Sequence, residues 1–362
     1  MRSVRNGCVD PSNGGTARGR FRHDAMLYSS DAEFLAGIVP FLRAAVAAGE
    51  PALAVLAPAK NELLRAALGD ESKYVRFEDM TAVGRNPACI IPAWAEFLDS
   101  AGADGGPVRG IGEPVSASRT ATELAEAQLH EALLNRAFAG RPGFWLRCPY
   151  DMATLTPEVI AAASRTHPVV GHAGHGHSEE PGASLRGMLD MGTLERPLPE
   201  PHAVLAMSRF DEPTLDVVRN LVREHAARAG LGSEQVRRLV LAVHEVAANS
   251  IRHGGGRGTL RVWRDGGSLV CEIRDRGHIR DPLVGRTRPL PNATGGRGLW
   301  IANQICDLVQ IRSTAAGTVV RVHQSNRGGA AWRGDATRLG DTAGFGDTAG
   351  FGDAAFRDAA ES

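Results

Sequence analysis

The sequence predicts two domains, a mainly parallel α/β domain followed by an α+β domain. Three observations lead to this prediction. The chain has 362 residues, 43% of them hydrophobic, which is enough for two buried cores. Short apolar runs alternate with helical patterns through the first half. A segment rich in Gly, His, Ser and Pro, residues 171–200, then interrupts the alternation and is typical of a linker.

Composition narrows the class of protein. Lys plus Arg equals Asp plus Glu, at 41 each, so charge gives no reason to expect nucleic acid or an anionic membrane as a direct partner. No run approaches the ~18 apolar residues that a membrane span needs. The five cysteines form no CxxC pair, which indicates a reduced, cytoplasmic protein.

The first domain is predicted at residues 21–170, after a Gly- and Arg-rich segment, 1–20, that we expect to be disordered. Its predicted elements are, in order, a helix at 31–48, a strand at 51–57, a helix near 59–68, a strand near 74–77, a helix at 88–100, a strand at 108–111, a helix at 120–139 and a strand at 144–146. Strands that alternate with helices predict a mainly parallel sheet.

The second domain is predicted at residues 201–324. Its predicted elements are a strand at 203–209, helices at 213–229 and 233–252, a hairpin turning at Asp265-Gly266-Gly267, a Gly-rich loop, a further helix and two final strands. After it, the hexapeptide GDTAGF occurs twice in tandem, at 340–345 and 346–351. Residues 325–362 are therefore predicted to be a low-complexity, disordered tail.

Polar residues on the helix 233–252 suggest a phosphate-handling site. Glu245 and Asn249 are four residues apart and project from one helix face. A carboxylate and an amide one turn apart suit an activated hydroxyl or water beside a hydrated Mg²⁺, which prefers oxygen ligands. Taken alone, this pair is more often just an exposed polar face.

Glycine-containing segments further along the chain fit the same chemistry. Asp275 ends a predicted strand, where a carboxylate can accept a hydrogen bond from an exocyclic amine such as that of adenine, and Gly277 lets the backbone approach the base. The run Gly295–Gly298 opens a helix whose free N–H groups attract phosphate. Thr318 opens the last strand, where its hydroxyl is expected to support Asp275.

A lid is predicted between the Asp275 turn and this helix. Residues 278–294 carry three arginines and three prolines, which fits a mobile loop with cations over a polyphosphate. The arginines are Arg280, Arg286 and Arg288. An ordinary surface loop is the alternative.

In order and spacing, AVHEVAANSIRH (242–253), DRG (275–277) and GGRGLW (295–300) resemble the N box and the two glycine boxes of the GHKL ATPases. Within that superfamily the chain most resembles the small anti-sigma serine kinases, which share the ExxxN helix. The resemblance implies ATP and Mg²⁺ as cofactors and assigns roles to individual residues. Glu245 would be the general base, Asn249 the Mg²⁺ ligand and Asp275 the adenine-binding residue. The remaining nucleotide-binding residues would be Gly277, Gly296, Arg297, Gly298 and Thr318.

The resemblance implies a cytoplasmic anti-sigma factor that phosphorylates Ser or Thr of an antagonist of the STAS type and sequesters a sigma factor, with homodimerisation as a family expectation. Two alternatives stay open. Ile279 replaces the second glycine of the first glycine box, which favours an ATP-binding switch without kinase activity. A histidine kinase would need a phosphoacceptor hairpin, which has no room before Glu245, and His130 is interpreted as a surface histidine.

The first half resembles the MEDS sensory domain of methanogen and methylotroph regulators over residues 23–168. The matching pieces are His23, Leu27-Tyr28, FLRAAVAAGEP (41–51), IGEP (111–114), HEALLN (130–135), CPYD (148–151) and RTHP (165–168). The resemblance implies an α/β fold without a phosphate loop, and indeed no GxxxxGK[ST] is present. It also implies sensing, of a small organic molecule in our interpretation.

Two further groups in this half are candidates for sites. Glu113, Cys148, Tyr150 and Asp151 follow predicted strand ends, where ligands bind in open α/β sheets, so they could converge on one sensory cleft or simply pack and cap the fold. Four histidines from 167 to 177 invite a metal-site interpretation, but the glycines between them favour a solvated linker. They are His167, His172, His175 and His177.

Overall fold

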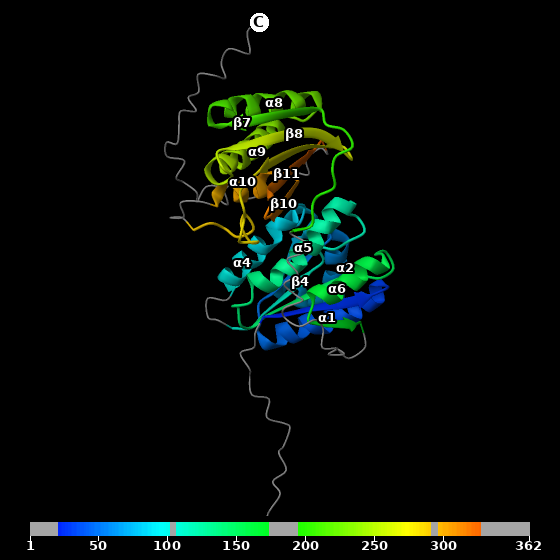
Figure 1. Ribbon diagram of the computed structural model, residues 1–362. Helices are drawn as coiled ribbons and strands as arrows, with labels where there is room; N and C mark the ends of the chain where they lie inside the picture. Colours follow the sequence, from blue (N-terminus) through cyan, green and yellow to red (C-terminus); the bar gives the residue numbers. More distant parts are fainter. Residues whose placement is uncertain (1–20, 102–105, 174–194, 291–295, 327–362) are drawn as a thin grey trace, which may run out of the picture. The chain divides into compact units, whose positions relative to one another are not determined.

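The computed structural model describes residues 21–101, 106–173, 195–290 and 296–326. These residues form two sheets of different kinds (Figure 1). The first is parallel, with strand order β3-β2-β4-β5-β1-β6, and the second is antiparallel, with order β10-β11-β9-β8-β7. The predicted fold class is therefore confirmed for both domains. No helix among the described residues is long and apolar enough to cross a membrane.

The N-terminal sheet is built from short, largely buried strands. They are β1 (Arg22–Tyr28), β2 (Ala52–Leu56), β3 (Val75–Asp79), β4 (Val108–Gly112), β5 (Phe144–Asp151) and β6 (Val169–His172). All neighbouring strands in this sheet pair in parallel. Strands buried on both faces read as continuous apolar runs, which is why ALAVL in β2 was recognisable from the sequence.

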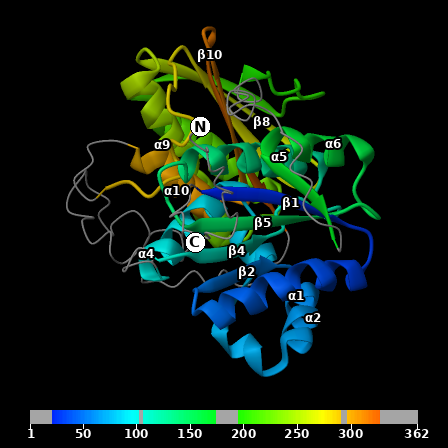
Figure 2. The ribbon, with the colours of Figure 1, turned by 90° about the horizontal axis from the view of Figure 1, so that it is seen from below.

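Helices cover both faces of this sheet. One core cluster joins the sheet to α1 (Asp31–Ala48) and α2 (Pro58–Leu68), and the other joins it to α4 (Ile90–Ala101), α5 (Ala121–Ala137) and α6 (Pro157–Thr166). Figure 2 shows α1 and α2 on one side of the strands and α5 and α6 on the other. The short helices are α3 (Met80–Val83), η1 (Gly69–Tyr74) and η2 (Pro87–Cys89).

The bounds of α1 match the predicted helix because both ends carry strong local signals. Ser30 caps its start by accepting a hydrogen bond from the Glu33 backbone N–H. Gly49 ends it in the left-handed conformation, with φ of 67°, and its N–H donates to the carbonyls of Ala45 and Val46.

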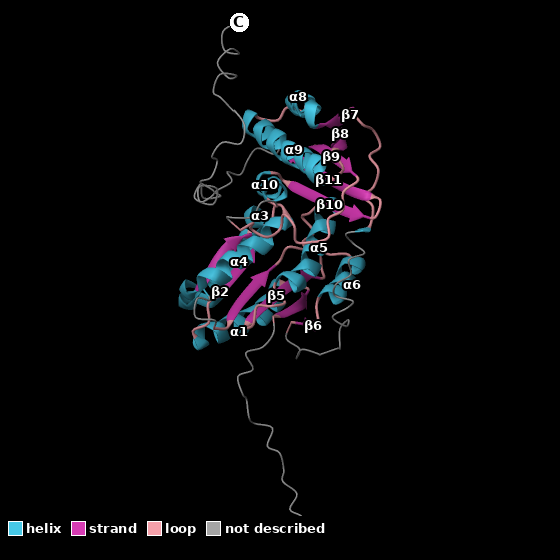
Figure 3. Cartoon of the chain, turned by 60° about the vertical axis from the view of Figure 1, so that its left-hand side comes forward, coloured by secondary structure: helices cyan, strands magenta, loops and turns pink. Residues whose placement is uncertain are grey.

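The C-terminal domain places helices on one face of its antiparallel sheet, as Figure 3 shows. The helices are α8 (Leu215–Arg228), α9 (Ser233–His253) and α10 (Arg297–Ile305), preceded by η3 (Glu212–Thr214). The strands are β7 (Ala206–Asp211), β8 (Arg257–Asp265), β9 (Ser268–Asp275), β10 (Leu308–Thr314) and β11 (Gly317–Ser325). The predicted hairpin forms between β8 and β9, where Gly266 and Gly267 both have positive φ.

Apart from α3 and the short 3-10 helices, the elements absent from the sequence-based prediction are β1, α6 and β6. The first, β1, lies inside the sheet although it begins with the polar residues His23 and Asp24, which hid the apolar pattern. The last, β6, extends to His172 and so enters the segment 171–200 that was expected to be linker. The GDTAGF repeats lie outside the described residues.

Candidate functional site

Three of the predicted nucleotide-site residues meet at the contact between α9 and α10. Glu245 and Asn249 lie one turn apart on α9 and are half-buried. Gly298, in the first turn of α10, lies so close that a Cβ placed on it would be 2.9 Å from Glu245 Oε2 and 3.0 Å from Asn249 Nδ2. The start of α10 therefore faces the carboxylate and the amide of α9 directly, as the two motifs predict.

The start of α10 begins at a glycine and has no side-chain cap among the described residues. Gly296 is the N-cap and adopts the left-handed conformation, with φ of 84°. No side chain caps this end of the helix within the described part of the chain. The first N–H groups of a helix attract anions when no side chain satisfies them. Gly295, the first glycine of the predicted box, lies outside the described residues.

Asp275 is held beside the C-terminal end of α9 by two donors. Its Oδ2 accepts a hydrogen bond from Ser250 Oγ at 2.5 Å, and its Oδ1 accepts one from the Gly277 backbone N–H at 2.7 Å. Each carboxylate oxygen keeps a further lone pair for an external donor. Ser250 was missed by the sequence analysis, because a serine on the buried stripe of α9 gives no sequence signal of a polar partner.

Thr318 supports the turn after Asp275 and not the carboxylate itself. Its register partner across β9 and β11 is Asp275. However, its hydroxyl donates to the Gly277 carbonyl at 2.9 Å and lies 3.0 Å from Ser313 Oγ. Ser313 in turn accepts from the backbone N–H of Ile279 at 2.8 Å. This chain of bonds fixes the backbone on which Gly277 sits.

The predicted lid is more firmly anchored than expected. Arg286 is only 2% exposed, and its guanidinium pairs with Glu126 Oε2 at 3.2 Å. Glu126, on α5, also accepts from Arg312 at 2.7 Å through its other oxygen. The prediction that Arg286 is a lid cation over the phosphates is therefore wrong, whereas Arg280 and Arg288 are exposed.

Ile279, which stands where the glycine pattern has its second glycine, has a packing role. Its side chain packs against the core of the C-terminal domain. It also lines a cavity of about 240 Å³ together with His278, Ile311 and Ser313, but Glu245 and Asn249 do not line that cavity. Because position 279 is isoleucine and not glycine, an apolar contact attaches the first residues of the predicted lid to the core.

Of the four residues of the predicted sensory cleft, Glu113 and Asp151 lie close enough for their charges to interact, whereas Cys148 and Tyr150 lie elsewhere. Successive side chains of a strand point to opposite faces of a sheet. Cys148 and Tyr150 therefore lie in the core cluster on the α4 and α5 side, whereas Glu113 contacts Tyr28, which belongs to the cluster on the α1 side. Asp151 caps the following turn by accepting from the Ala153 backbone N–H.

Glu113 forms a compact polar group at the strand ends. Its Oε1 accepts from the Tyr28 hydroxyl and from Lys60 Nζ, each at 2.6 Å, and Lys60 also contacts the Tyr28 hydroxyl. Burial raises the pKa of Glu113, and the nearby Lys60 opposes that shift. Burial likewise raises the pKa of Tyr28, so its hydroxyl stays a proton donor.

Two histidine interpretations need correction. His130 is 0% exposed, not on the surface, and burial lowers its pKa to about 3. His167 is also 0% exposed and lies 3.1 Å from Glu131 Oε2, so it belongs to the folded domain and not to a solvated linker. His172 is exposed at the end of β6, and His175 and His177 lie outside the described residues.

Comparison with protein-family models agrees with both resemblances. Residues 22–168 match the family described as MEDS, the methanogen/methylotroph, DcmR sensory domain. Residues 210–323 match the histidine kinase-like ATPase domain. The chain thus carries a MEDS domain followed by a GHKL-like ATPase domain.

Comparisons with curated protein sequences and with solved structures give no further indication of function. No curated protein sequence matches the chain. Among solved structures, one match is the crystal structure of the RsbU and RsbW domains of a Mycobacterium tuberculosis protein. It is 19% identical with a TM-score of 0.25, and it covers 33% of this chain and 32% of that one. This chain therefore spans about a third of that structure's length, and a likeness at this level says nothing about function.

Replacing Glu126 with Gln should lower the free energy of unfolding by about 3 kcal/mol, because Arg286 and Arg312 would remain buried without a counter-charge. Urea denaturation followed by tryptophan fluorescence measures this change. The matched control is Glu71→Gln, which removes an exposed ion pair with Arg43 and should shift stability by less than about 0.5 kcal/mol. Equal shifts in the two variants would contradict the role of Glu126.

Proposed function

We propose that this chain, which carries a MEDS sensory domain and a histidine kinase-like ATPase domain, is a signal-responsive anti-sigma factor with serine/threonine kinase activity. In this proposal it binds Mg-ATP and phosphorylates Ser or Thr of an anti-sigma antagonist. Phosphorylation releases the antagonist and leaves the sigma factor bound to the kinase. The partners, a cytoplasmic location and homodimerisation rest on the resemblance to the small anti-sigma serine kinases.

The observation that carries the proposal is the close approach of α10 to Glu245 and Asn249. Gly298 leaves the space between them that a Cβ would fill. A bound polyphosphate at the open N-terminus of α10 would therefore lie within reach of both α9 side chains. Their donor atoms include a carboxylate and an amide oxygen, which are ligand types that suit Mg²⁺.

Each residue then has a distinct task. Asn249 would hold the cation through its amide oxygen, and the cation would supply positive charge that offsets the charge of the phosphate groups. Glu245 accepts the proton of the attacking hydroxyl, a role that requires a carboxylate close to the transferred group. Asp275, oriented by Ser250 and Gly277, accepts a hydrogen bond from the exocyclic amine of adenine.

A nucleotide-gated binding protein without kinase activity is the second candidate. Its specific support is Ile279, which packs against the core where the family pattern has glycine. A histidine kinase is less favoured, because His130 is fully buried and cannot present its ring to a phosphate donor. The experiment below distinguishes all three.

Full-length protein incubated with γ-labelled Mg-ATP and an extract of the source cells should label a small protein with acid-stable, alkali-sensitive phosphate. Glu245→Ala should reduce the labelling rate by about 10²- to 10⁴-fold, the usual contribution of a general base. Asp275→Asn should reduce labelling by weakening nucleotide binding. Gel autoradiography after acid and alkali treatment gives the readout.

The matched controls carry the same substitutions on nearby exposed residues. Glu234→Ala lies on the first turn of α9, and Asp265→Asn lies beside the β8–β9 turn, so both should label as the wild type does. Acid-labile label on this chain would move it to the histidine-kinase class. Intact ATP binding without label on any protein would leave the nucleotide-gated switch and remove Glu245 as a base.

Gly298→Ala should reduce phosphoryl transfer at least tenfold, because the new Cβ would displace the Glu245 carboxylate. The fold should tolerate the change, since alanine is the better helix former by roughly 1 kcal/mol. Single-turnover labelling and thermal unfolding of the same preparation separate the two effects. Gly140→Ala, where a Cβ would meet nothing within 4 Å, is the control. Unchanged transfer in Gly298→Ala would count against this placement of Glu245.

A further inference from the structure

Four buried side chains in the MEDS domain meet at one point that the ATPase chemistry does not use. They are His23 on β1, Glu131 on α5, Cys148 on β5 and His167 just after α6. Each offers one ligand atom, and these atoms all lie within 4.8 Å of one another. From this juxtaposition we propose that the four residues form a closed binding site for one divalent transition-metal ion of the zinc type.

The spacing suits such an ion. His23 Nε2 is 3.0 Å from Glu131 Oε2 and 3.3 Å from Cys148 Sγ, and His167 Nε2 is 3.1 Å from the same Glu131 oxygen. Tetrahedral Zn²⁺ with bonds of about 2.0–2.3 Å sets its ligand atoms roughly 3.3–3.7 Å apart. Movements of a few tenths of an ångström would therefore accommodate the ion.

Neighbouring groups orient both imidazoles with Nε2 toward this point. The Asn135 amide nitrogen donates to the Thr166 carbonyl at 2.7 Å, which turns its oxygen toward His23 Nδ1 at 3.1 Å. His167 Nδ1 lies 3.0 Å from the Ala163 carbonyl, which can only accept. Both Nδ1 atoms therefore carry the proton in the neutral rings, an arrangement typical of metal-binding histidines.

The same bonds leave an excess of acceptors at the centre of the group. Two Nε2 lone pairs and a carboxylate oxygen face one another, and His167 Nε2 and Glu131 Oε1 have no hydrogen-bond partner among the described residues. Buried polar atoms seldom lack partners. A cation at the centre satisfies these lone pairs at once.

Charge points to a divalent ion with affinity for sulfur. Within the described part of the chain, the basic groups within ion-pair distance of Glu131 are the two imidazoles, which carry no charge in their neutral form. A carboxylate and the Cys148 thiolate together supply two negative charges, which balance a 2+ ion in a site closed to water. Mixed N, S and O ligands favour Zn²⁺ over Mg²⁺ or Ca²⁺, which bind oxygen.

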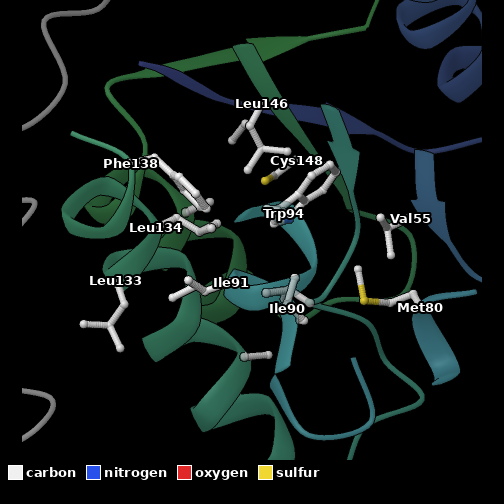
Figure 4. Close-up of a cluster of buried hydrophobic side chains, with 14 of the residues drawn as sticks. Val55, Met80, Ile90, Ile91, Trp94, Leu133, Leu134, Phe138, Leu146 and Cys148 are labelled. Carbon is white, nitrogen blue, oxygen red and sulfur yellow. The ribbon is translucent and has the colours of Figure 1, made fainter. Parts of the chain in front are cut away.

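Apolar packing closes the site on the Cys148 side. Figure 4 shows Cys148 beside Leu146, with Trp94 and Phe138 in the same cluster. All four proposed ligands are themselves buried. Four ligands from the described residues would fill a tetrahedral shell, so the ion would join β1, α5, β5 and the end of α6, as structural zinc sites do. The proposal is independent of kinase activity.

The experiment uses full-length protein in a Cys8→Ser background, because Cys8 lies outside the described residues. Zinc content by mass spectrometry should be one ion per chain after gel filtration. X-ray absorption at the zinc edge should show one sulfur at about 2.3 Å and three N or O ligands at about 2.0 Å. Absence of tightly held zinc, or a shell of N and O alone, would overturn the proposal and indicate an adventitious ion on other histidines.

Cobalt replacement tests the individual ligands. Co²⁺-loaded protein should show a thiolate-to-cobalt charge-transfer band, which Cys148→Ser should abolish and His23→Gln should weaken with at least a tenfold loss of Co²⁺ affinity. The controls are Cys271→Ser, a buried cysteine of the other domain, and His130→Gln, the buried neighbour of Glu131. Both should keep the band. A wild-type band retained in Cys148→Ser would refute the site, and the zinc-edge measurement on the parent protein decides the question if a variant does not fold.

Discussion

Close backbone packing around Asp275 is the constraint on which the candidate nucleotide site depends. A Cβ on Gly254 would lie 2.5 Å from the Asp275 carboxyl carbon, and one on Gly277 would lie 2.9 Å from its Oδ1. A Cβ on Gly317 would lie 2.2 Å from the Asp275 carbonyl oxygen. The end of α9, the turn after β9 and the start of β11 can therefore meet only because all three residues are glycines. The carboxylate is immobilised where these backbones converge.

The candidate C-terminal site could be proposed from the sequence because its residues are close together along the chain. Its chemistry lies in short contiguous motifs, and helix periodicity alone brings Glu245 and Asn249 to one face. Ser250 escaped notice because a serine on a buried helix stripe looks like packing until its partner, Asp275, is seen in space. Arg286 was assigned wrongly for the same reason, since its partner Glu126 lies 160 residues earlier in the chain.

The N-terminal half shows what sequence spacing cannot supply. Most of its strands and helices followed from alternation and caps, yet β1 was missed because polar residues begin it. These same polar residues include His23, whose partners Glu131 and Cys148 lie 108 and 125 residues away. Only part of the predicted cleft comes together, because Cys148 and Asp151 are three residues apart on a strand and so face opposite sides of the sheet.

The two polar groups of the MEDS domain therefore have different physical characters. The Glu113 group contains its own cation, Lys60, and its own donor, Tyr28, so it is satisfied by this chain alone. The His23, Glu131, Cys148 and His167 group has acceptors in excess and no such cation among its described contacts. A buried group of the first kind stabilises a fold by itself, whereas one of the second kind needs a charge from outside. That asymmetry is why the inference of a bound metal ion attaches to the second group and not to the first.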